Sequence, residues 1–567
     1  MKLIKNTFKG IFYRILSFII LGIIVACTVE QENSLSPTIF LKDTATFTST
    51  IEPTTTPTTT VLPPLKVWID PGLPRKVLQQ TVIPTNLQLT SNSEDADIRL
   101  TNITDLQNNS TWVYALVTPF PSLIEMQSFE ELQQTWNGTN DNDLLIYVTE
   151  ETKTVLESVL GIAGEGHVVI EEQDNLLNAA WEKRDVLAIV PFEELQPKWR
   201  VISLNGQSPI SNQFDLMQYP LKVTYGWMIK EGSQSSRADE LAAINLPALI
   251  SNYDPEKLTI LVMTGVTALV RATAVRMEKY GVTYPAEKIR DWLVQADITH
   301  ISNEVSFAEG CPDPKSDPYP LVFCSKPAYF DLLTYVGADV IDLTGNHQLD
   351  WGRTALEYTL SLYEQNGLAY YAAGRTEDQA KDAVLIEHNG NKFAFMGCNP
   401  VGPAYVWAKS DNPGVANCDY QYIESRIKEL KNQGYQVIFT YQYFETYRHS
   451  TEAYEERDFH RVADAGAVIV SGSQAHHPMI MEFYNDSFIH YGLGNLFFDQ
   501  MWVNTVTIPH ATRKEFIDRY AFYDGKLIST ELLTAYLEDY AQPRPMNEEE
   551  RLDFLKTIFD AAGWGPY

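Results

Sequence analysis

Four clusters of polar side chains lie in the second half of the chain, each just after a short apolar run. The clusters contain Asn303 and Glu304; Asn346, His347 and Asp350; Gln442 and Glu445; and Gln474, His476 and His477. Carboxylates and imidazoles exchange protons near neutral pH, as general acid–base catalysis requires. Imidazoles and carboxylates also bind divalent transition metals, whereas amides make neutral, directional hydrogen bonds. The residue types therefore predict an acid–base site, with or without a metal, or a polar binding site.

The most specific cluster begins with Gly345-Asn346-His347, where a glycine turn presents an amide oxygen and an imidazole together. The other clusters have structural alternatives: the first is also typical of a helix cap or a surface loop. The third is equally typical of a solvated loop, and the paired histidines of the fourth can be structural. A further segment, residues 489–499, is apolar but contains two glycines and Asn495, so we expect it to bring backbone close to a neighbour.

The apolar runs before these clusters predict strands. They cover residues 258–263, 297–301, 339–343, 437–440 and 467–470. Near-continuous apolar strands between amphipathic helices indicate sheets that are covered on both faces. Ligands of open α/β sheets bind at the carboxyl ends of the strands. We therefore expect Asn303, His347, Gln442 and His476 to converge on one edge of a common sheet.

Short apolar runs also alternate with helical stretches in the first half of the chain, which indicates a smaller α/β domain. This region is similar to a lobe of a periplasmic solute-binding protein, and a generic α/β domain that binds nothing is the alternative. The predicted boundaries are 65–221 for this domain, 222–256 for a linker with a helix, 257–533 for the larger α/β domain and 534–567 for a tail with a helix.

The first residues predict export. Basic residues precede an apolar run from Ile15 to Ala26, which has the form of a secretory signal. A transmembrane anchor is the less favoured alternative, because a membrane span needs about 20 apolar residues. The sequence before Cys27 resembles a lipobox, so we expect residues 1–27 to be a lipoprotein signal peptide and Cys27 to carry lipid. The Thr-, Ser- and Pro-rich residues 28–64 predict an extended linker that holds the folded part outside the cell membrane.

The charge balance argues against one class of partner. Lys and Arg number 43 and Asp and Glu 73, which gives a formal net charge of −30. A protein of this charge repels phosphate backbones, so we expect no nucleic-acid partner.

Four cysteines remain once Cys27 is assigned to lipid: Cys311, Cys324, Cys398 and Cys418. An even number in an exported chain favours disulfides. The local pairs, Cys311 with Cys324 and Cys398 with Cys418, are favoured among the three possible connectivities. Free buried thiols are the alternative.

Together, the motifs resemble the CapA family of capsule and poly-γ-glutamate synthesis proteins. The matching residues are Asn303-Glu304, Gly345-Asn346-His347 with Asp350 and Gly352, Gly472 with His476, and Tyr491 to Asp499. The resemblance implies a four-layer metallophosphatase-like sandwich for the larger domain. It also implies a role in the synthesis, attachment or processing of an extracellular anionic polymer, with the polymer or a saccharide as partner.

Three positions depart from the family pattern. Val266 stands where the family usually has Asp, and Gln442 and Gln474 stand where it usually has His. Valine binds no metal, and amide oxygens bind transition metals less well than imidazoles or carboxylates. We therefore expect no full two-metal centre, and at most one divalent ion (Mn, Fe or Zn) at Asn346 and His476.

Two functions remain open. The first is a hydrolase or transferase in which Glu304, His347 and Asp350 are catalytic. The residues expected to bind substrate are Asn303, Gln442, Glu445, Gln474, His477 and Asn495. The second is a non-catalytic polymer- or sugar-binding scaffold with a degenerate metal site.

Overall fold

The computed structural model describes residues 63–103, 109–125, 128–140, 143–230, 237, 244–316, 321–501 and 511–565. By its internal contacts the chain divides into residues 1–63 and a compact unit from Pro64 to Tyr567. The predicted signal peptide, Cys27 and nearly all of the predicted linker lie outside the described residues. Among the helices that are described, none is both long and apolar enough to cross a membrane.

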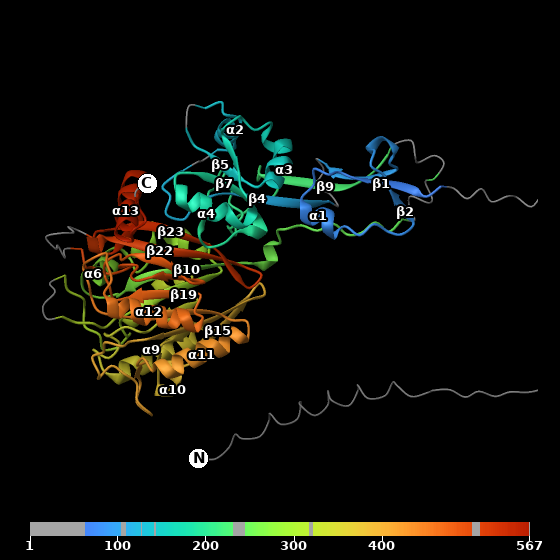
Figure 1. Ribbon diagram of the computed structural model, residues 1–567. Coiled ribbons are helices and arrows are strands. Elements are labelled where there is room, and N and C mark those ends of the chain that lie inside the picture. The colour runs from blue at the N-terminus through green and yellow to red at the C-terminus, as the bar shows by residue number, and fades with distance from the viewer. Residues whose placement is uncertain are drawn as a thin grey trace, which may run out of the picture. The chain divides into compact units, whose positions relative to one another are not determined.

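The N-terminal part of the compact unit contains a mixed nine-stranded sheet (Figure 1). Its strands are β1 (Leu65–Ile69), β2 (Leu87–Leu89), β3 (Ile98–Asn102), β4 (Ser110–Pro119), β5 (Ile146–Val148), β6 (Val168–Ile170), β7 (Leu187–Pro191), β8 (Trp199–Val201) and β9 (Lys222–Ile229). Its helices are α1 (Arg75–Gln80), α2 (Phe129–Asn137), α3 (Glu150–Leu160) and α4 (Gln173–Lys183). Strand β9 lies in the stretch assigned to a linker and pairs with both β3 and β4.

The C-terminal part contains two large sheets. The seven-stranded sheet has the order β13-β12-β11-β10-β22-β23-β24, with β10 to β13 parallel. Its strands are β10 (Leu258–Thr267), β11 (Ile298–Asn303), β12 (Val340–Asp342), β13 (Ala369–Tyr371), β22 (Lys514–Tyr523), β23 (Lys526–Glu538) and β24 (Gln542–Pro545). The six-stranded sheet has the order β15-β16-β18-β19-β21-β20, with β16, β18, β19 and β21 parallel. Its strands are β15 (Val384–His388), β16 (Asn391–Cys398), β18 (Gln436–Gln442), β19 (Ile469–Ser473), β20 (Met481–Tyr484) and β21 (Ser487–His490). A small pair is formed by β14 (Ala373–Gly374) and β17 (Gly414–Val415).

Three apolar cores arrange these sheets and their helices in four layers. Phe395, Phe488 and Phe516 belong to the core between the two sheets. A second core joins the outer face of the seven-stranded sheet to α6 (Arg271–Tyr280), α7 (Arg290–Val294), α8 (Phe330–Tyr335) and α9 (Arg353–Gln365). A third joins the six-stranded sheet to α11 (Tyr420–Asn432) and α12 (Ala453–Ala465), while α10 (Glu377–Lys381) packs beside β14. The predicted four-layer α/β sandwich is therefore confirmed.

Both local disulfides form, Cys311 with Cys324 and Cys398 with Cys418, so the favoured pairing is confirmed. The chain ends in α13 (Glu548–Ala561), which matches the helix predicted near the C-terminus. This helix begins with a capping box and stacks Phe554 on Phe516 of β22, with ring centroids 4.6 Å apart.

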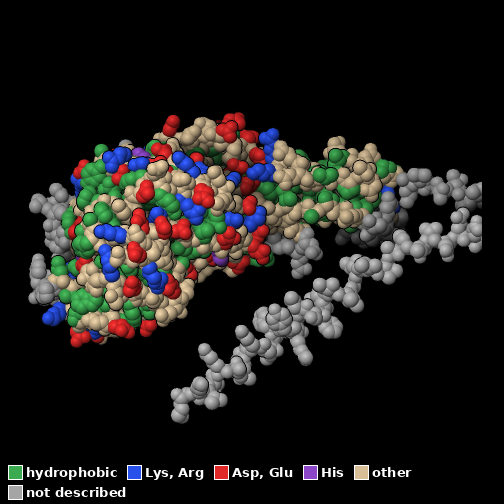
Figure 2. Space-filling view, turned by 90° about the horizontal axis from the view of Figure 1, so that it is seen from below, with side chains coloured by type: hydrophobic (Ala, Val, Ile, Leu, Met, Phe, Trp, Pro, Cys, Tyr) green, Lys and Arg blue, Asp and Glu red, His purple; other side chains and the backbone are tan. Residues whose placement is uncertain are grey.

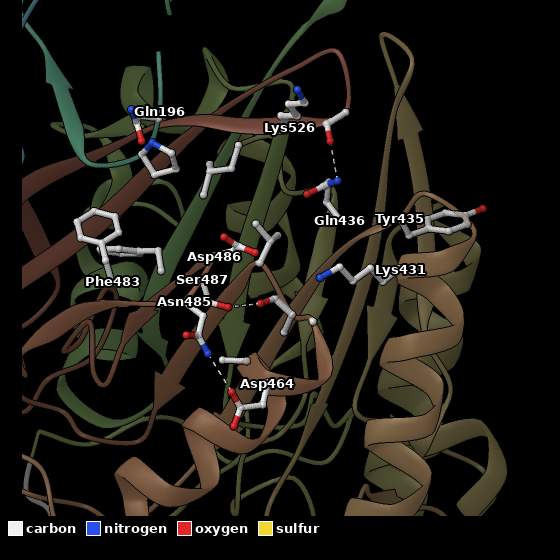
Figure 3. Close-up of a pocket in the computed structure, with 18 of the residues that line it drawn as sticks. Gln196, Lys431, Tyr435, Gln436, Asp464, Phe483, Asn485, Asp486, Ser487 and Lys526 are labelled. Carbon is white, nitrogen blue, oxygen red and sulfur yellow. Dashed lines mark hydrogen bonds between the residues drawn. The ribbon is translucent and has the colours of Figure 1, made fainter. Parts of the chain in front are cut away.

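The surface mixes charges, and a large hollow in it lies away from the predicted site. On the face shown in Figure 2, acidic and basic side chains are interspersed with apolar ones. One hollow of about 1210 Å³ is lined by Lys431, Gln436, Val468 and Lys526 (Figure 3). Gln436 begins β18 and Val468 directly precedes β19. The hollow therefore lies at the amino ends of these strands, whereas the predicted clusters follow their carboxyl ends.

Candidate functional site

The carboxyl ends of the two large sheets meet through buried hydrogen bonds. Ser302, near the end of β11, donates to Asp342 Oδ2 at 3.0 Å, and its hydroxyl lies 3.0 Å from that of Ser473 at the end of β19. Burial raises the pKa of Asp342 to about 6, although hydrogen bonds from Thr344 and Ser302 partly offset it. The clusters therefore come close together at the ends of two different sheets, so the expectation that they converge on one edge of a common sheet is wrong.

Glu304 and His347 are neighbours at this edge. Glu304 follows β11, is only 2% exposed, and neither of its carboxylate oxygens has a hydrogen-bond partner among the described residues. Gly345 packs against its backbone, since a Cβ at Gly345 would lie 2.7 Å from Glu304 Cα. A backbone bridge between Val305 and His347 fixes the two segments side by side. Because a buried carboxylate without a partner is costly, its retention here indicates a group that is kept for a ligand.

Asp350 orients the imidazole of His347. The ring nitrogen Nδ1 lies 2.6 Å from Asp350 Oδ2, one turn along the chain. Burial lowers the pKa of His347, but the hydrogen bond to Asp350 and the negative charges of Glu304 and Asp350 outweigh it. The pKa of His347 is therefore held above its ordinary value, which favours a protonated ring that can act as an acid.

Three amide side chains occupy the adjacent position. Gln442, at the end of β18, donates through Nε2 to Asn346 Oδ1 at 3.1 Å and also to Gln474 Oε1. All three come from predicted clusters, and Gln442 and Gln474 are buried. Gln442 Nε2 therefore links three strand ends, while Gln442 Oε1 is buried without a hydrogen-bond partner among the described residues.

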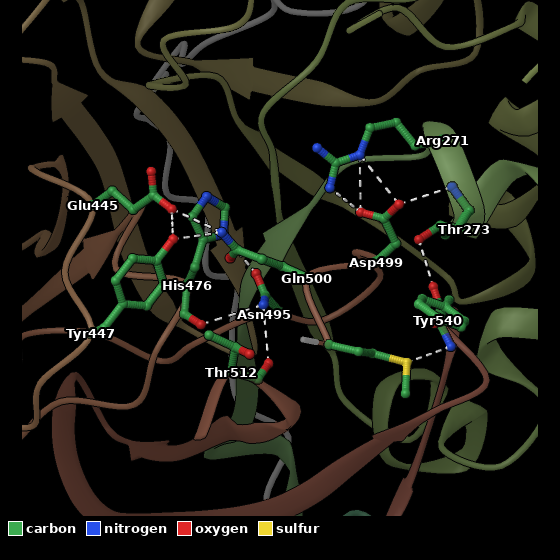
Figure 4. Close-up of polar contacts among 12 residues, drawn as sticks. Arg271, Thr273, Glu445, Tyr447, His476, Asn495, Asp499, Gln500, Thr512 and Tyr540 are labelled. Atoms are coloured by element: carbon green, nitrogen blue, oxygen red, sulfur yellow. Dashed lines mark hydrogen bonds and ion pairs between the residues drawn. The ribbon is translucent and has the colours of Figure 1, made fainter. Parts of the chain in front are cut away.

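His476 is held by Asn495. Its Nδ1 lies 2.7 Å from Asn495 Oδ1, and Asn495 Nδ2 points to the carbonyl oxygens of His476 and Thr512 (Figure 4). Because Asn495 Nδ2 donates to these carbonyls, the amide oxygen of Asn495 is the atom that accepts a hydrogen bond from the His476 ring. Asn495 is brought to this edge by its backbone bridge to Val266.

The close approach predicted for residues 489–499 is present. A Cβ at Gly265 would lie 2.2 Å from the carbonyl oxygen of Gly494, and Val266 N–H donates to the same oxygen at 3.0 Å. The end of β10, where a metal-binding carboxylate is expected in the family pattern, is therefore packed against backbone.

Three predicted substrate-binding residues have other contacts. Asn303 Nδ2 donates to the Val305 carbonyl and the Tyr363 hydroxyl, so its side chain points into the helix-side core. His477 faces His449, with ring centroids 4.4 Å apart, and burial, aided by His449, lowers its pKa to about 3. Glu445 accepts hydrogen bonds from Tyr447 and from Gln500, as Figure 4 shows.

The residues present do not fit a divalent metal. Asn346 and Gln474 use their amide oxygens on Gln442, and Glu445 is bonded to Tyr447 and Gln500. Over the described part of the chain, no group of three or more His, Cys, Asp or Glu side chains could hold an ion.

Sequence reasoning missed an ion pair that lies between His347 and His476. Arg271 Nε lies 3.1 Å from Asp499 Oδ1, and the backbone N–H of Ala272 donates to Asp499 Oδ2 at 2.9 Å (Figure 4). The guanidinium lies 5.4 Å from the ring centroid of Phe323 and 5.0 Å from that of Phe498. An arginine four residues past the end of β10 was the available signal, but its partner lies 228 residues away.

Comparisons with known proteins agree with this arrangement of motifs. Residues 260–500 match the family model described as bacterial capsule synthesis protein PGA_cap. This part of the chain is similar to that family. The PGA_cap region contains every residue placed at the site above except Thr512.

Two relatives of the chain come from bacilli. The chain is 25% identical over 268 residues to the capsule biosynthesis protein CapA of Bacillus anthracis. This alignment covers 46% of this chain and 64% of that protein. It is 29% identical over 170 residues to the PGA biosynthesis protein CapA of Bacillus subtilis (strain 168); this alignment covers 29% of this chain and 44% of that protein. The chain thus spans less than two thirds of either relative. Among solved structures, a 5'-nucleotidase precursor from Thermus thermophilus is 12% identical, with a TM-score of 0.28 over 54% of this chain and 58% of that one.

Proposed function

We propose that this protein acts outside the cell membrane on a capsular polymer of the poly-γ-glutamate type, by metal-independent acid–base chemistry. The match of residues 260–500 to the PGA_cap family model and the similarity to the two CapA proteins support the polymer class. One observation carries the chemistry: the unpartnered, buried carboxylate of Glu304 lies beside an imidazole, His347, that Asp350 orients.

In this proposal the two groups divide the proton transfers of a hydrolase or transferase. Glu304 takes a proton from the attacking water or hydroxyl group, and His347 gives its proton to the leaving atom of the bond that breaks. The raised pKa of His347 keeps that proton available near neutral pH, while Asp350 fixes the ring nitrogen that carries the other proton. Net charge is conserved, because one proton enters the site as another leaves it.

Deletion of either group tests the proposal. Turnover of purified poly-γ-glutamate by the full chain, followed by size-exclusion chromatography, should fall about 100-fold or more in His347→Asn and Glu304→Gln. His460→Asn is the matched control, because His460 also lies 2.6 Å from a carboxylate, Glu482, but away from the site. Equal losses in the control, or full turnover in both site variants, would remove the acid–base assignment.

The second candidate function is a non-catalytic polymer- or sugar-binding scaffold. The amide cluster of Asn346, Gln442 and Gln474 favours it, because neutral amides suit directional binding and occupy positions where the family pattern has metal ligands. Binding of the polymer without any turnover by the unmodified chain, together with weaker binding by Gln442→Ala, would select this function.

We further propose that Cys27 carries the lipid that anchors the protein at the extracytoplasmic face of the membrane. The basic and apolar residues before Cys27 support this location. Cys27→Ser should move the protein from the membrane fraction to the soluble fraction after cell lysis. Retention of that variant in the membrane at the level of the unmodified chain would contradict lipidation.

A further inference from the structure

One face of the His347 ring is covered by an aromatic side chain. Phe323 stacks on the imidazole with ring centroids 3.9 Å apart and an interplanar angle of 13°. A second restraint on the His347 ring, this one in the plane of the ring, is its hydrogen bond to Asp350. A flat ring at this distance limits rotation of the imidazole about its side-chain bonds, and a phenyl group has no proton to exchange.

Phe323 belongs to a column of side chains that continues past His347. The guanidinium of Arg271 lies against Phe323 and Phe498, and the Phe498 ring lies 5.0 Å from that of His476. Asp499 binds Arg271 through both carboxylate oxygens, and the side chain of Asp499 is only 7% exposed. The column therefore connects the two histidines of the site through contacts that are fixed at Arg271.

A disulfide anchors the chain directly beside Phe323. Cys324, the next residue, is bonded to Cys311 and is 3% exposed. Ser325, one residue further, accepts a hydrogen bond from Ala308 N–H, donates its own N–H to the Ser306 carbonyl, and donates its hydroxyl to the Leu269 carbonyl. The backbone next to Phe323 is thus tied to the segments that follow β10 and β11, which carry Arg271 and Glu304.

We propose that Phe323, anchored by the Cys311–Cys324 disulfide, is a positioning residue that holds the imidazole of His347 in place for proton transfer. The proposal rests on the acid–base role proposed for His347 and adds how the fold keeps that ring in register with Asp350 and Glu304. It also gives the disulfide a role beyond stability, because the bond lies one residue from the ring that contacts His347.

The test compares the two disulfides in the full chain. Cys311→Ser/Cys324→Ser removes the anchor, and Cys398→Ser/Cys418→Ser is the matched control that removes the other bond. With ¹³C-labelled histidine, the His347 ring signal is identified among the ten histidines by its loss in His347→Asn. The signal should carry the ring-current shift of a stacked phenyl group, lose that shift in the first double variant, and keep it in the control.

Single substitutions at Phe323 serve if a cysteine variant does not fold. Phe323→Leu keeps apolar bulk but removes the flat face, so the ring-current shift should disappear and turnover should fall about 10- to 100-fold with KM nearly unchanged. Phe323→Tyr keeps the flat face and should restore both. A His347 signal that is identical in unmodified chain, Phe323→Leu and the first cysteine variant would overturn the positioning role.

Turnover separates this inference from the proposed function. A displaced His347 signal with reduced turnover supports both. A displaced signal with full turnover overturns the positioning role for catalysis, and full turnover in His347→Asn as well overturns the acid–base function on which it rests. A merely structural role of Phe323 would lower the melting temperature in Phe323→Tyr and Phe323→Leu alike without restoring turnover in the former.

Discussion

Substitution of Gly345 by alanine should damage the site through a single steric contact. The added Cβ would lie 2.7 Å from Cα and 2.8 Å from the carbonyl oxygen of Glu304, which are backbone atoms that cannot rotate away. Overpacking of this kind costs about 1–3 kcal/mol, and we take about 2 kcal/mol. A domain of this size loses about 2–4 °C of melting temperature per kcal/mol, so the expected decrease is about 4–8 °C.

The matched control for this prediction is Gly310→Ala. Gly310 has open space where its Cβ would stand and no positive φ, so alanine there should leave the melting temperature unchanged or slightly raised. Differential scanning calorimetry of the three full-length chains measures the effect, and turnover should fall with stability only in Gly345→Ala. A melting temperature of Gly345→Ala within about 1 °C of the unmodified chain would refute the close packing of Gly345 on Glu304.

Three further predictions concern charge and metal. Asp350→Asn should lower the pKa of His347, because it removes a hydrogen bond and a negative charge that raise it; an NMR titration that finds a pKa unchanged or higher contradicts the pairing. Burial raises the pKa of Asp342 to about 6, so the contribution of this group to stability is complete below about pH 4 and is lost as the pH rises through 6. The melting temperature of the unmodified chain should therefore fall over this pH range relative to that of Asp342→Asn. Plots of melting temperature against pH that run parallel for the two chains would exclude the effect. Elemental analysis of the purified chain should find Mn, Fe and Zn far below one ion per molecule, and chelation should leave its melting temperature unchanged; one tightly bound ion would disprove the assignment of Gln442 to an amide cluster.

The sequence predicts the strands and the polar clusters at their carboxyl ends, because both depend on local and general rules, but it does not predict that the strands form two sheets. Continuous apolar runs mark strands that are buried on both faces, and parallel strands place their carboxyl ends together. The local disulfides follow similarly, since short loops close at the lowest entropic cost. These rules place His347 at the carboxyl end of one sheet and Gln442 and Gln474 at that of the other, and contacts between the sheets bring the three together.

These rules do not predict the direction in which a side chain points within the turns that follow the strands. Gln474 and His476 adopt φ angles of 78° and 48°, which non-glycine residues seldom do, so the turn directs His477 toward His449. Asn303, at the end of β11, reaches the Tyr363 hydroxyl on the helix side, which period-two alternation alone does not reveal. Contacts such as Arg271 with Asp499 join residues that are distant in the chain, and one sequence contains no record of such pairs.

The hydrogen bond between Ser302 and Ser473 has a practical consequence, because it places the two sheets within reach of one small molecule. A ligand that contacts groups of both sheets would act as a clamp across the sandwich, and would resist its separation during unfolding. At 100 times its dissociation constant, such a ligand adds about 2.7 kcal/mol to the free energy of unfolding. Melting curves recorded against fragments of capsular polymers can therefore rank binders before any catalytic assay exists.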